Sequence, residues 1–135
     1  MNEMRSVLLV EDDIVDQMTV KRAFKELKIT NRFDIAGNGL EALALLRGGA
    51  ELPCGIILDL NMPKMNGMEF LRELRKDEKL MGLPVVVLTT SNEESGRIES
   101  ISLNVAGYVI KPLDHYEFVE VIRTIGQLLS LCKAQ

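Results

Sequence analysis

The chain alternates between short apolar runs and segments in which apolar residues recur at helical spacing. The runs are rich in β-branched residues and cover 7–10, 33–36, 55–58, 85–88 and 108–110. In the segments that follow them, apolar residues return every three or four positions, as a helix with one buried face requires. The clearest series is Phe118, Ile122, Ile125 and Leu129. The pattern predicts five strands that alternate with five helices, and Asp114 with Glu117 predicts a capping box at the start of the last helix.

Regular alternation of strand and helix favours a parallel sheet with helices on both faces. The runs GIIL and VVVL are apolar at every position, which is typical of strands buried on both sides. We therefore expect an α/β fold with a five-stranded parallel sheet in the order 2-1-3-4-5, as in flavodoxin-like proteins. Since no repeat, low-complexity tract or linker interrupts the pattern, we expect a single domain over residues 1–135.

Composition narrows the class of protein without changing this fold. The 135 residues carry a net charge of −4, with a pI near 5.1, so neither nucleic acid nor an anionic membrane is an expected partner. No apolar run approaches the roughly 18 residues that span a bilayer, and the N-terminal residues do not resemble a signal peptide. Cys54 and Cys132 lack metal-ligand spacing and are expected to be reduced thiols, so we expect a cytoplasmic protein.

Polar residues follow the strands at the edge where a doubly wound sheet binds its ligands. The first run is followed by Glu11, Asp12 and Asp13, and the third by Asp59. The carboxyl ends of strands 1 and 3 flank the functional crevice of such a sheet, so these acids should converge there. The fourth run delivers Thr89 and Thr90 to the same rim, and the fifth delivers Lys111.

This set of side chains points to phosphoryl transfer. Carboxylates about 5 Å apart repel each other by roughly 3 kcal/mol per pair at an effective dielectric constant near 20. Mg²⁺ would relieve that repulsion, since it prefers oxygen ligands and needs few of them from the protein. Lys111 adds a second positive charge, and Asp59, alone after the central strand, is the best candidate nucleophile.

Four motifs in order also resemble a known family. They are VEDD (10–13), DLNMPKMNG (59–67), LTTS (88–91) and YVIKP (108–112), with 30 residues from Asp59 to Thr89 and 22 from Thr89 to Lys111. Together they resemble the receiver domain of bacterial two-component response regulators, the CheY-like family. The stretches TVKRAFKEL, LTTSNEES and KPLD resemble the small stand-alone regulators that are associated with phytochrome kinases.

The resemblance implies a phosphoacceptor switch without an output domain, which catalyses only its own phosphorylation and dephosphorylation. Asp59 would accept a phosphoryl group from a sensor histidine kinase or phosphotransfer protein. With Mg²⁺ as cofactor, Asp12 and Asp59 would bind the ion directly, Asn61 through its backbone carbonyl, and Glu11 mainly through water. Thr89 and Lys111 would contact the attached phosphoryl group.

The same resemblance implies how the signal leaves the site. Tyr108 matches the family's switch aromatic, whose rotamer is coupled to Thr89, and phosphorylation would alter the surface formed by helix 4, strand 5 and helix 5. That surface would bind a downstream protein or a second copy of the chain. The Lys111–Pro112 bond resembles the family's cis peptide. Asn61, Thr90 and Ser91 match positions that tune the lifetime of the acyl phosphate.

Plainer interpretations stand beside several of these roles. Asp13 fits the N-cap of the next helix better than a third metal ligand. Tyr108 could be an ordinary strand-edge aromatic, and His115 is expected on the surface. Helix 5 carries apolar residues beyond its core stripe, which predicts an adhesive surface formed by Val119, Val121, Leu128 and Leu131.

Two other classes of protein use similar sheets. Phosphohydrolases that resemble the haloacid dehalogenases need a second Asp two residues after the nucleophile, and Asn61 stands there instead. A flavodoxin-like carrier of FMN would place a phosphate in an acidic crevice, and the chain has only two Tyr and no Trp to stack on a flavin. Both classes are disfavoured.

Overall fold

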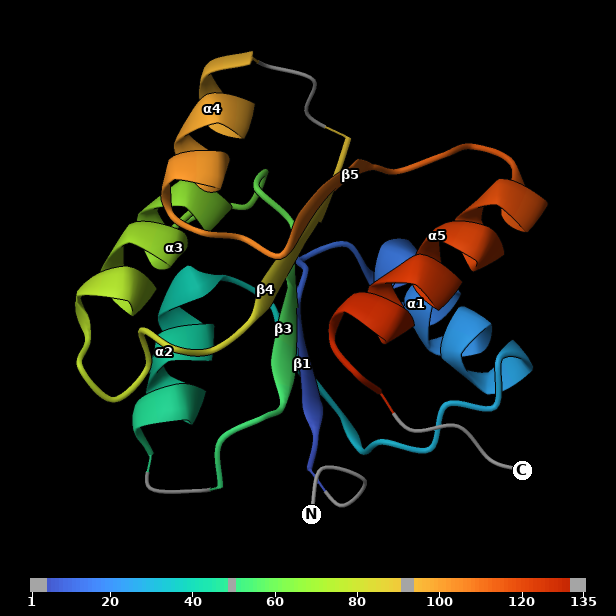
Figure 1. Cartoon of the computed structure of the whole chain (residues 1–135), viewed down its shortest axis with the longest axis horizontal. Coiled ribbons are helices and arrows are strands. Elements are labelled where there is room, and N and C mark those ends of the chain that lie inside the picture. Colours follow the sequence, from blue (N-terminus) through green and yellow to red (C-terminus); the bar gives the residue numbers. More distant parts are fainter. Residues whose placement is uncertain (1–4, 49–50, 91–93, 132–135) are drawn as a thin grey trace.

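Five parallel strands form one sheet, in the predicted order β2-β1-β3-β4-β5 (Figure 1). The computed structural model describes residues 5–48, 51–90 and 94–131. The strands are β1 (Val7–Val10), β2 (Phe33–Ala36), β3 (Gly55–Leu58), β4 (Val85–Thr89) and β5 (Gly107–Ile110). The helices are α1 (Ile14–Glu26), α2 (Gly39–Arg47), α3 (Gly67–Lys76), α4 (Glu94–Ser102) and α5 (His115–Leu128). The predicted alternation and fold class are confirmed.

Helices cover both faces of the sheet. Figure 1 shows α2, α3 and α4 on one side of the strands and α1 with α5 on the other. Alternate residues of each strand enter opposite cores: Leu8 and Val10 pack toward α2 and α3, whereas Val7 and Leu9 pack toward α1 and α5. β1, β3 and β4 are buried along their whole length, as their uninterrupted apolar sequences predict. None of the helices in the described ranges is both long and apolar enough to cross a membrane.

Side-chain caps fix where the helices begin. Asp114 accepts a hydrogen bond from the backbone N–H of Glu117 at 3.1 Å, which is half of the capping box predicted there. The complete box belongs to α3, where Asn66 and Glu69 each bond to the other's backbone N–H. Caps of this kind satisfy backbone donors that the first helical turn leaves without a partner.

Three of the four residues predicted to form an adhesive surface on α5 are used in part for packing against the core. Val119, Val121 and Leu131 are partly buried against the core on the α1/α5 face, and Leu128 is exposed. Helix α4 differs in the opposite sense: Ile98 and Ile101 lie three positions apart, as residues on one covered helix face would, yet they are 58% and 57% exposed. Apolar spacing identifies the helix, but the neighbours present in the fold decide which side is covered.

Gly67 lets the start of α3 lie directly against the end of β3. A Cβ atom at this position would overlap the backbone carbonyl oxygen of Asp59 and lie 2.6 Å from the Cα of Leu60. The N–H of Gly67 also donates to the carbonyl of Leu60 at 3.0 Å. This close approach fixes the loop that carries Asp59.

We therefore predict that Gly67→Ala lowers the free energy of unfolding by about 1–3 kcal/mol, because backbone atoms must shift to admit the methyl group. Urea denaturation followed by circular dichroism measures the change. Gly82→Ala is the matched control, since a Cβ there meets nothing within 4 Å. Equal stability of the two variants would contradict the prediction.

Candidate phosphoryl-transfer site

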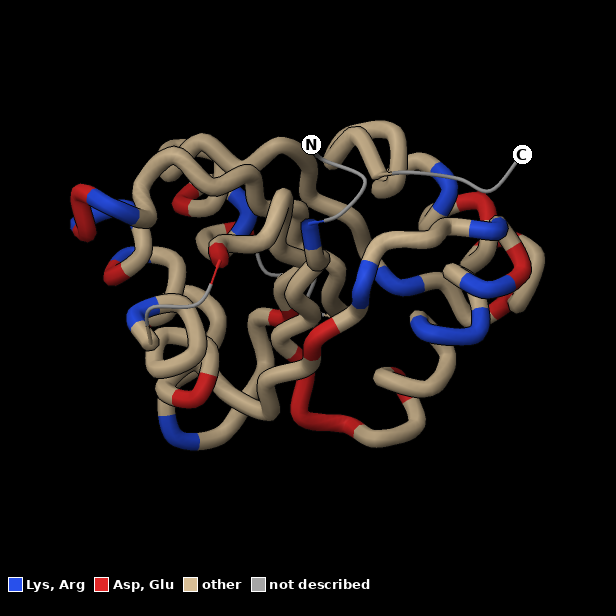
Figure 2. Tube along the Cα trace, turned by 90° about the horizontal axis from the view of Figure 1, so that it is seen from below, with Lys and Arg blue, Asp and Glu red and all other residues tan. Residues whose placement is uncertain are grey.

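Three carboxylates meet where β1 and β3 end. Glu11, Asp12 and Asp59 each place one oxygen within 4.8 Å of the others, and we call this group the acid cluster. Glu11 and Asp59 are 2% and 5% exposed, whereas Asp12 is exposed. The run of acids 11–13 forms the long red stretch of the tube in Figure 2, where the chain leaves the sheet. The predicted convergence of these acids is thus present.

The backbone of the sheet places the two buried acids. The N–H of Glu11 donates to Ala36 at 2.9 Å, and the N–H of Asp59 donates to Val10 at 3.0 Å, so the ladder extends one residue beyond each strand. Helix α1 holds Glu11 from the other side, because the amide of Gln17 donates to its carbonyl oxygen at 2.6 Å. The acids are close together because the backbone fixes them there.

Lys111 supplies the positive charge inside the site. Its Nζ lies 2.5 Å from Glu11 Oε1, 2.8 Å from Asp16 Oδ2 and 3.9 Å from Asp59 Oδ2, and its side chain is 8% exposed. The N–H of Lys111 donates to the carbonyl of Thr89 at 2.8 Å, which sets where the side chain starts. Asp16 was missed by the sequence reasoning. Its position in the first turn of α1, three residues after the end of the acidic run, is the signal that could have revealed it.

The pKa values of Glu11 and Lys111 show the competing forces in the site. Burial raises the pKa of Glu11 to about 7, with a further rise from the charge of Asp59, while Lys111 opposes both effects. Burial by itself would lower the pKa of Lys111, but hydrogen bonds to Asp16 and Glu11 and the charge of Asp59 outweigh it and raise that pKa. One ammonium therefore compensates only part of the carboxylate charge, and a divalent cation would stabilise the ionised cluster.

Asp13 forms the N-cap of α1. Its Oδ1 accepts hydrogen bonds from the backbone N–H groups of Val15 at 2.8 Å and Asp16 at 3.2 Å. These bonds support the N-cap interpretation over a third ligand. His115, as expected, lies on the surface, with its Nε2 3.1 Å from Glu26 Oε1.

The remaining predicted residues surround the cluster at different depths. Thr89 ends β4 and is fully buried, whereas Thr90 is exposed. Asn61 is exposed, and its N–H donates to Asp59 Oδ1 at 3.4 Å. Tyr108 pairs with Val87 in the β4–β5 register and packs, partly buried, against the core on the α2–α4 face. Ser91 and Cys132 lie outside the described residues.

The expected cis bond before Pro112 is absent. Within the three described ranges every peptide bond is trans, including Lys111–Pro112. The trans isomer is favoured for a bond to proline by about 0.5–1 kcal/mol. Lys111 reaches Glu11 with this isomer.

Comparison with known proteins identifies the family. The sequence profile of the response regulator receiver domain matches residues 7–123. The chain belongs to this family. Response regulator Rcp1 of Synechocystis sp. (strain ATCC 27184 / PCC 6803 / Kazusa) is 36% identical over 129 residues, which are 92% of this chain and 88% of Rcp1. This receiver domain therefore takes part in two-component signalling rather than in haloacid dehalogenase-like or flavin chemistry.

Solved structures of receivers show the same fold. The phosphorylated cyanobacterial phytochrome response regulator RcpA superimposes with a TM-score of 0.87 at 31% identity, covering 94% of each chain. The Mn²⁺-bound form of Rcp1 has a TM-score of 0.85 at 33% identity, covering 97% of this chain and 99% of that one. Receiver domains bind a divalent metal at an acidic pocket, and the acid cluster offers the oxygen ligands that such an ion prefers. They interact with histidine kinases or phosphotransfer proteins and with downstream targets.

The different environments of neighbouring acids predict different effects on metal binding. We expect Asp12→Asn to weaken Mn²⁺ binding at least tenfold, because it removes the exposed carboxylate of the acid cluster. Asp13→Asn should leave the affinity within about twofold, since Asn also caps helices well. Titration calorimetry with MnCl₂ measures both variants, and equal losses would show that the cluster is not the metal site.

Proposed function

We propose that Asp59 accepts a phosphoryl group from a sensor histidine kinase or phosphotransfer protein, in a reaction that depends on Mg²⁺. The observation that carries the proposal is the position of Asp59. This buried carboxylate lies in the acid cluster, 3.9 Å from the ammonium of Lys111. A nucleophile, a metal site and a cation in one crevice are what phosphoryl transfer needs.

Each residue of the site has a separate role in the proposed transfer. An oxygen of Asp59 attacks phosphorus, the bond from phosphorus to the donor nitrogen breaks, and the electron pair stays with the imidazole. Bound Mg²⁺ would neutralise charge on the transferring phosphoryl oxygens. Asp12, Asp59 and the Asn61 carbonyl would bind the ion directly, with Glu11 acting through water. Lys111 and Thr89 would hold the phosphoryl oxygens of the product.

The same chemistry would switch a surface at the edge of the sheet. Phosphorylation leaves a group of about −2 charge at the site. In the proposed switch, Thr89 moves toward the phosphoryl group and Tyr108 changes rotamer in the space beside it. Thr89 belongs to β4 and Tyr108 to the edge strand β5, so the change would reach that strand and the helices on either side of it.

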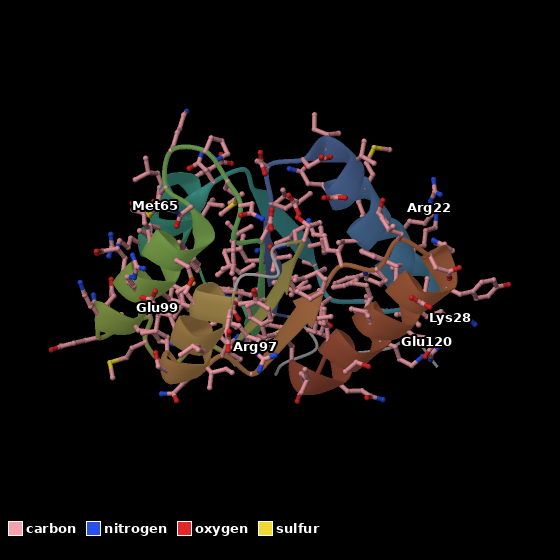
Figure 3. All side chains as sticks on the ribbon, turned by 90° about the horizontal axis from the view of Figure 1, so that it is seen from above. Arg22, Lys28, Met65, Arg97, Glu99 and Glu120 are labelled. Carbon is pink, nitrogen blue, oxygen red and sulfur yellow. The ribbon has the colours of Figure 1, made fainter. Side chains whose placement is uncertain are left out.

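We propose that output passes through the face formed by α4, β5 and α5. Figures 1 and 3 show these elements side by side, and Figure 3 shows Arg97 of α4 and Glu120 of α5 on this side of the molecule. Its exposed apolar residues are Ile98, Ile101, Ile110 and Leu128. An apolar face with charged neighbours suits protein contact, either with a downstream target or with a second copy of the chain.

The phosphoacceptor role predicts the gain of one phosphoryl group on incubation with acetyl phosphate and MgCl₂, measured by intact mass. Asp59→Asn should abolish the gain, and omission of Mg²⁺ with added EDTA should suppress it. Asp34→Asn is the matched control, because Asp34 lies on β2 in an exposed ion pair with Arg32. Equal labelling of Asp59→Asn would defeat the proposal.

If the output is formation of a dimer through this face, the phosphorylated protein should sediment faster than the unmodified protein. Ile101→Glu should weaken this association at least tenfold by placing a charge in an apolar contact. Leu45→Glu is its control, since Leu45 is comparably exposed but lies on α2. A protein that stays monomeric in both states at high concentration would leave contact with a downstream target as the output.

A further inference from the structure

Asp16 competes with the proposed phosphoacceptor Asp59 for the ammonium group of Lys111. The ammonium of Lys111 has three N–H donors. Two carboxylate oxygens lie within hydrogen-bond distance, Glu11 Oε1 at 2.5 Å and Asp16 Oδ2 at 2.8 Å. Asp59 Oδ2, at 3.9 Å, lies beyond that distance. Lys111 is thus held on the α1 side of the site and not against the phosphoacceptor.

We propose that Asp16 is a positioning residue that restrains Lys111 in the unmodified protein and so slows phosphorylation of Asp59. The inference rests on the proposed function and deepens it. Asp16 belongs neither to the acid cluster nor to the residues proposed to touch the phosphoryl group. Its effect would pass through Lys111.

Backbone contacts fix the point from which Asp16 reaches Lys111. The N–H of Asp16 donates to the N-cap Asp13 at 3.2 Å, and the neighbouring Gln17 ties the first turn of α1 to the end of β1. Lys111, in contrast, reaches across the site on a long chain of single bonds from the end of β5. When a phosphoryl group arrives, the longer side chain of Lys111 is the one that can redirect its charged group toward it.

The surroundings of the ion pair allow such an exchange. Asp16 is 36% exposed at its side chain and, with Lys111, lines a surface pocket together with Thr90 and Pro112. Water can therefore replace Lys111 as a partner of Asp16 without leaving a buried charge. An ion pair that is partly open to solvent is weak, so the restraint is modest and reversible.

Charge acts in the same direction as the hydrogen bond. Asp16 adds a fourth carboxylate beside Glu11, Asp12 and Asp59, and the single ammonium is shared among them. Lys111 engaged by Asp16 neutralises less of the charge on an incoming phosphodonor. Removal of Asp16 should therefore favour transfer.

We expect Asp16→Asn to increase the rate of phosphorylation by acetyl phosphate with saturating Mg²⁺ by about three- to tenfold. Asp16→Glu should stay near the wild-type rate, because a longer carboxylate can still engage Lys111. Glu26→Gln controls for loss of one acid from α1, since Glu26 lies at the far end of that helix and pairs with His115. Time courses by intact mass give the rates, and unchanged Mn²⁺ affinity of Asp16→Asn shows that the acid cluster is intact.

A double variant tests whether the effect passes through Lys111. In a Lys111→Met background, Asp16→Asn should accelerate phosphorylation much less than it does with Lys111 present, because only the direct charge effect is left. An equal acceleration in both backgrounds would assign the whole effect to charge and overturn the restraint, as would an unchanged or slower rate for Asp16→Asn. Failure of the wild type to gain a phosphoryl group would defeat the proposed function instead.

Discussion

The site depends on repulsion between two buried acids that the sheet holds together. Glu11 and Asp59 follow adjacent strands, and their backbone N–H groups continue the hydrogen-bond ladders, so neither can move away. The strongest compensation within the described residues comes from Lys111, 100 positions later in sequence than Glu11. A charge that only partly cancels its neighbours leaves a site ready for a cation and an anionic ligand. The chemistry therefore follows from an electrostatic imbalance that the fold imposes.

The elements around the site differ in how firmly they are held. β1 and β3 are buried throughout and carry the acids, whereas β5 is an edge strand with three half-buried residues and one exposed residue. Helix α4 turns Ile98 and Ile101 to solvent and is attached to α3 through polar contacts. Arg72 forms a two-pronged ion pair with Glu99, which is labelled beside α3 in Figure 3. Arg75 donates to the carbonyls of Leu103 and Asn104. Buried central strands and a more exposed edge strand suit the proposed transmission from the site to the α4–β5–α5 face.

Sequence reasoning recovered what periodicity and strand ends determine. The alternation of apolar strands and helices indicates a doubly wound fold, whose common sheet order is the one found. The convergence of Glu11, Asp12 and Asp59 then follows from the strands that they end. It failed where a third element decides the outcome. The covered sides of α4 and α5 depend on their neighbours, and the partnership of Asp16 with Lys111 depends on how α1 leaves the sheet. Apolar spacing contains no information about either relation.

The four acids between positions 11 and 16 show how local geometry gives similar carboxylate side chains four different environments. Glu11 still belongs to the ladder and is buried against Lys111, while Asp12 has left the sheet and is open to solvent, where a hydrated ion can reach it. Asp13 turns back to cap α1, and Asp16, one helical turn later, faces the site again. A strand that passes directly into a capped helix changes the direction of its side chains within a few residues. That change of direction separates the proposed metal ligands from the proposed restraint on Lys111 within six consecutive positions.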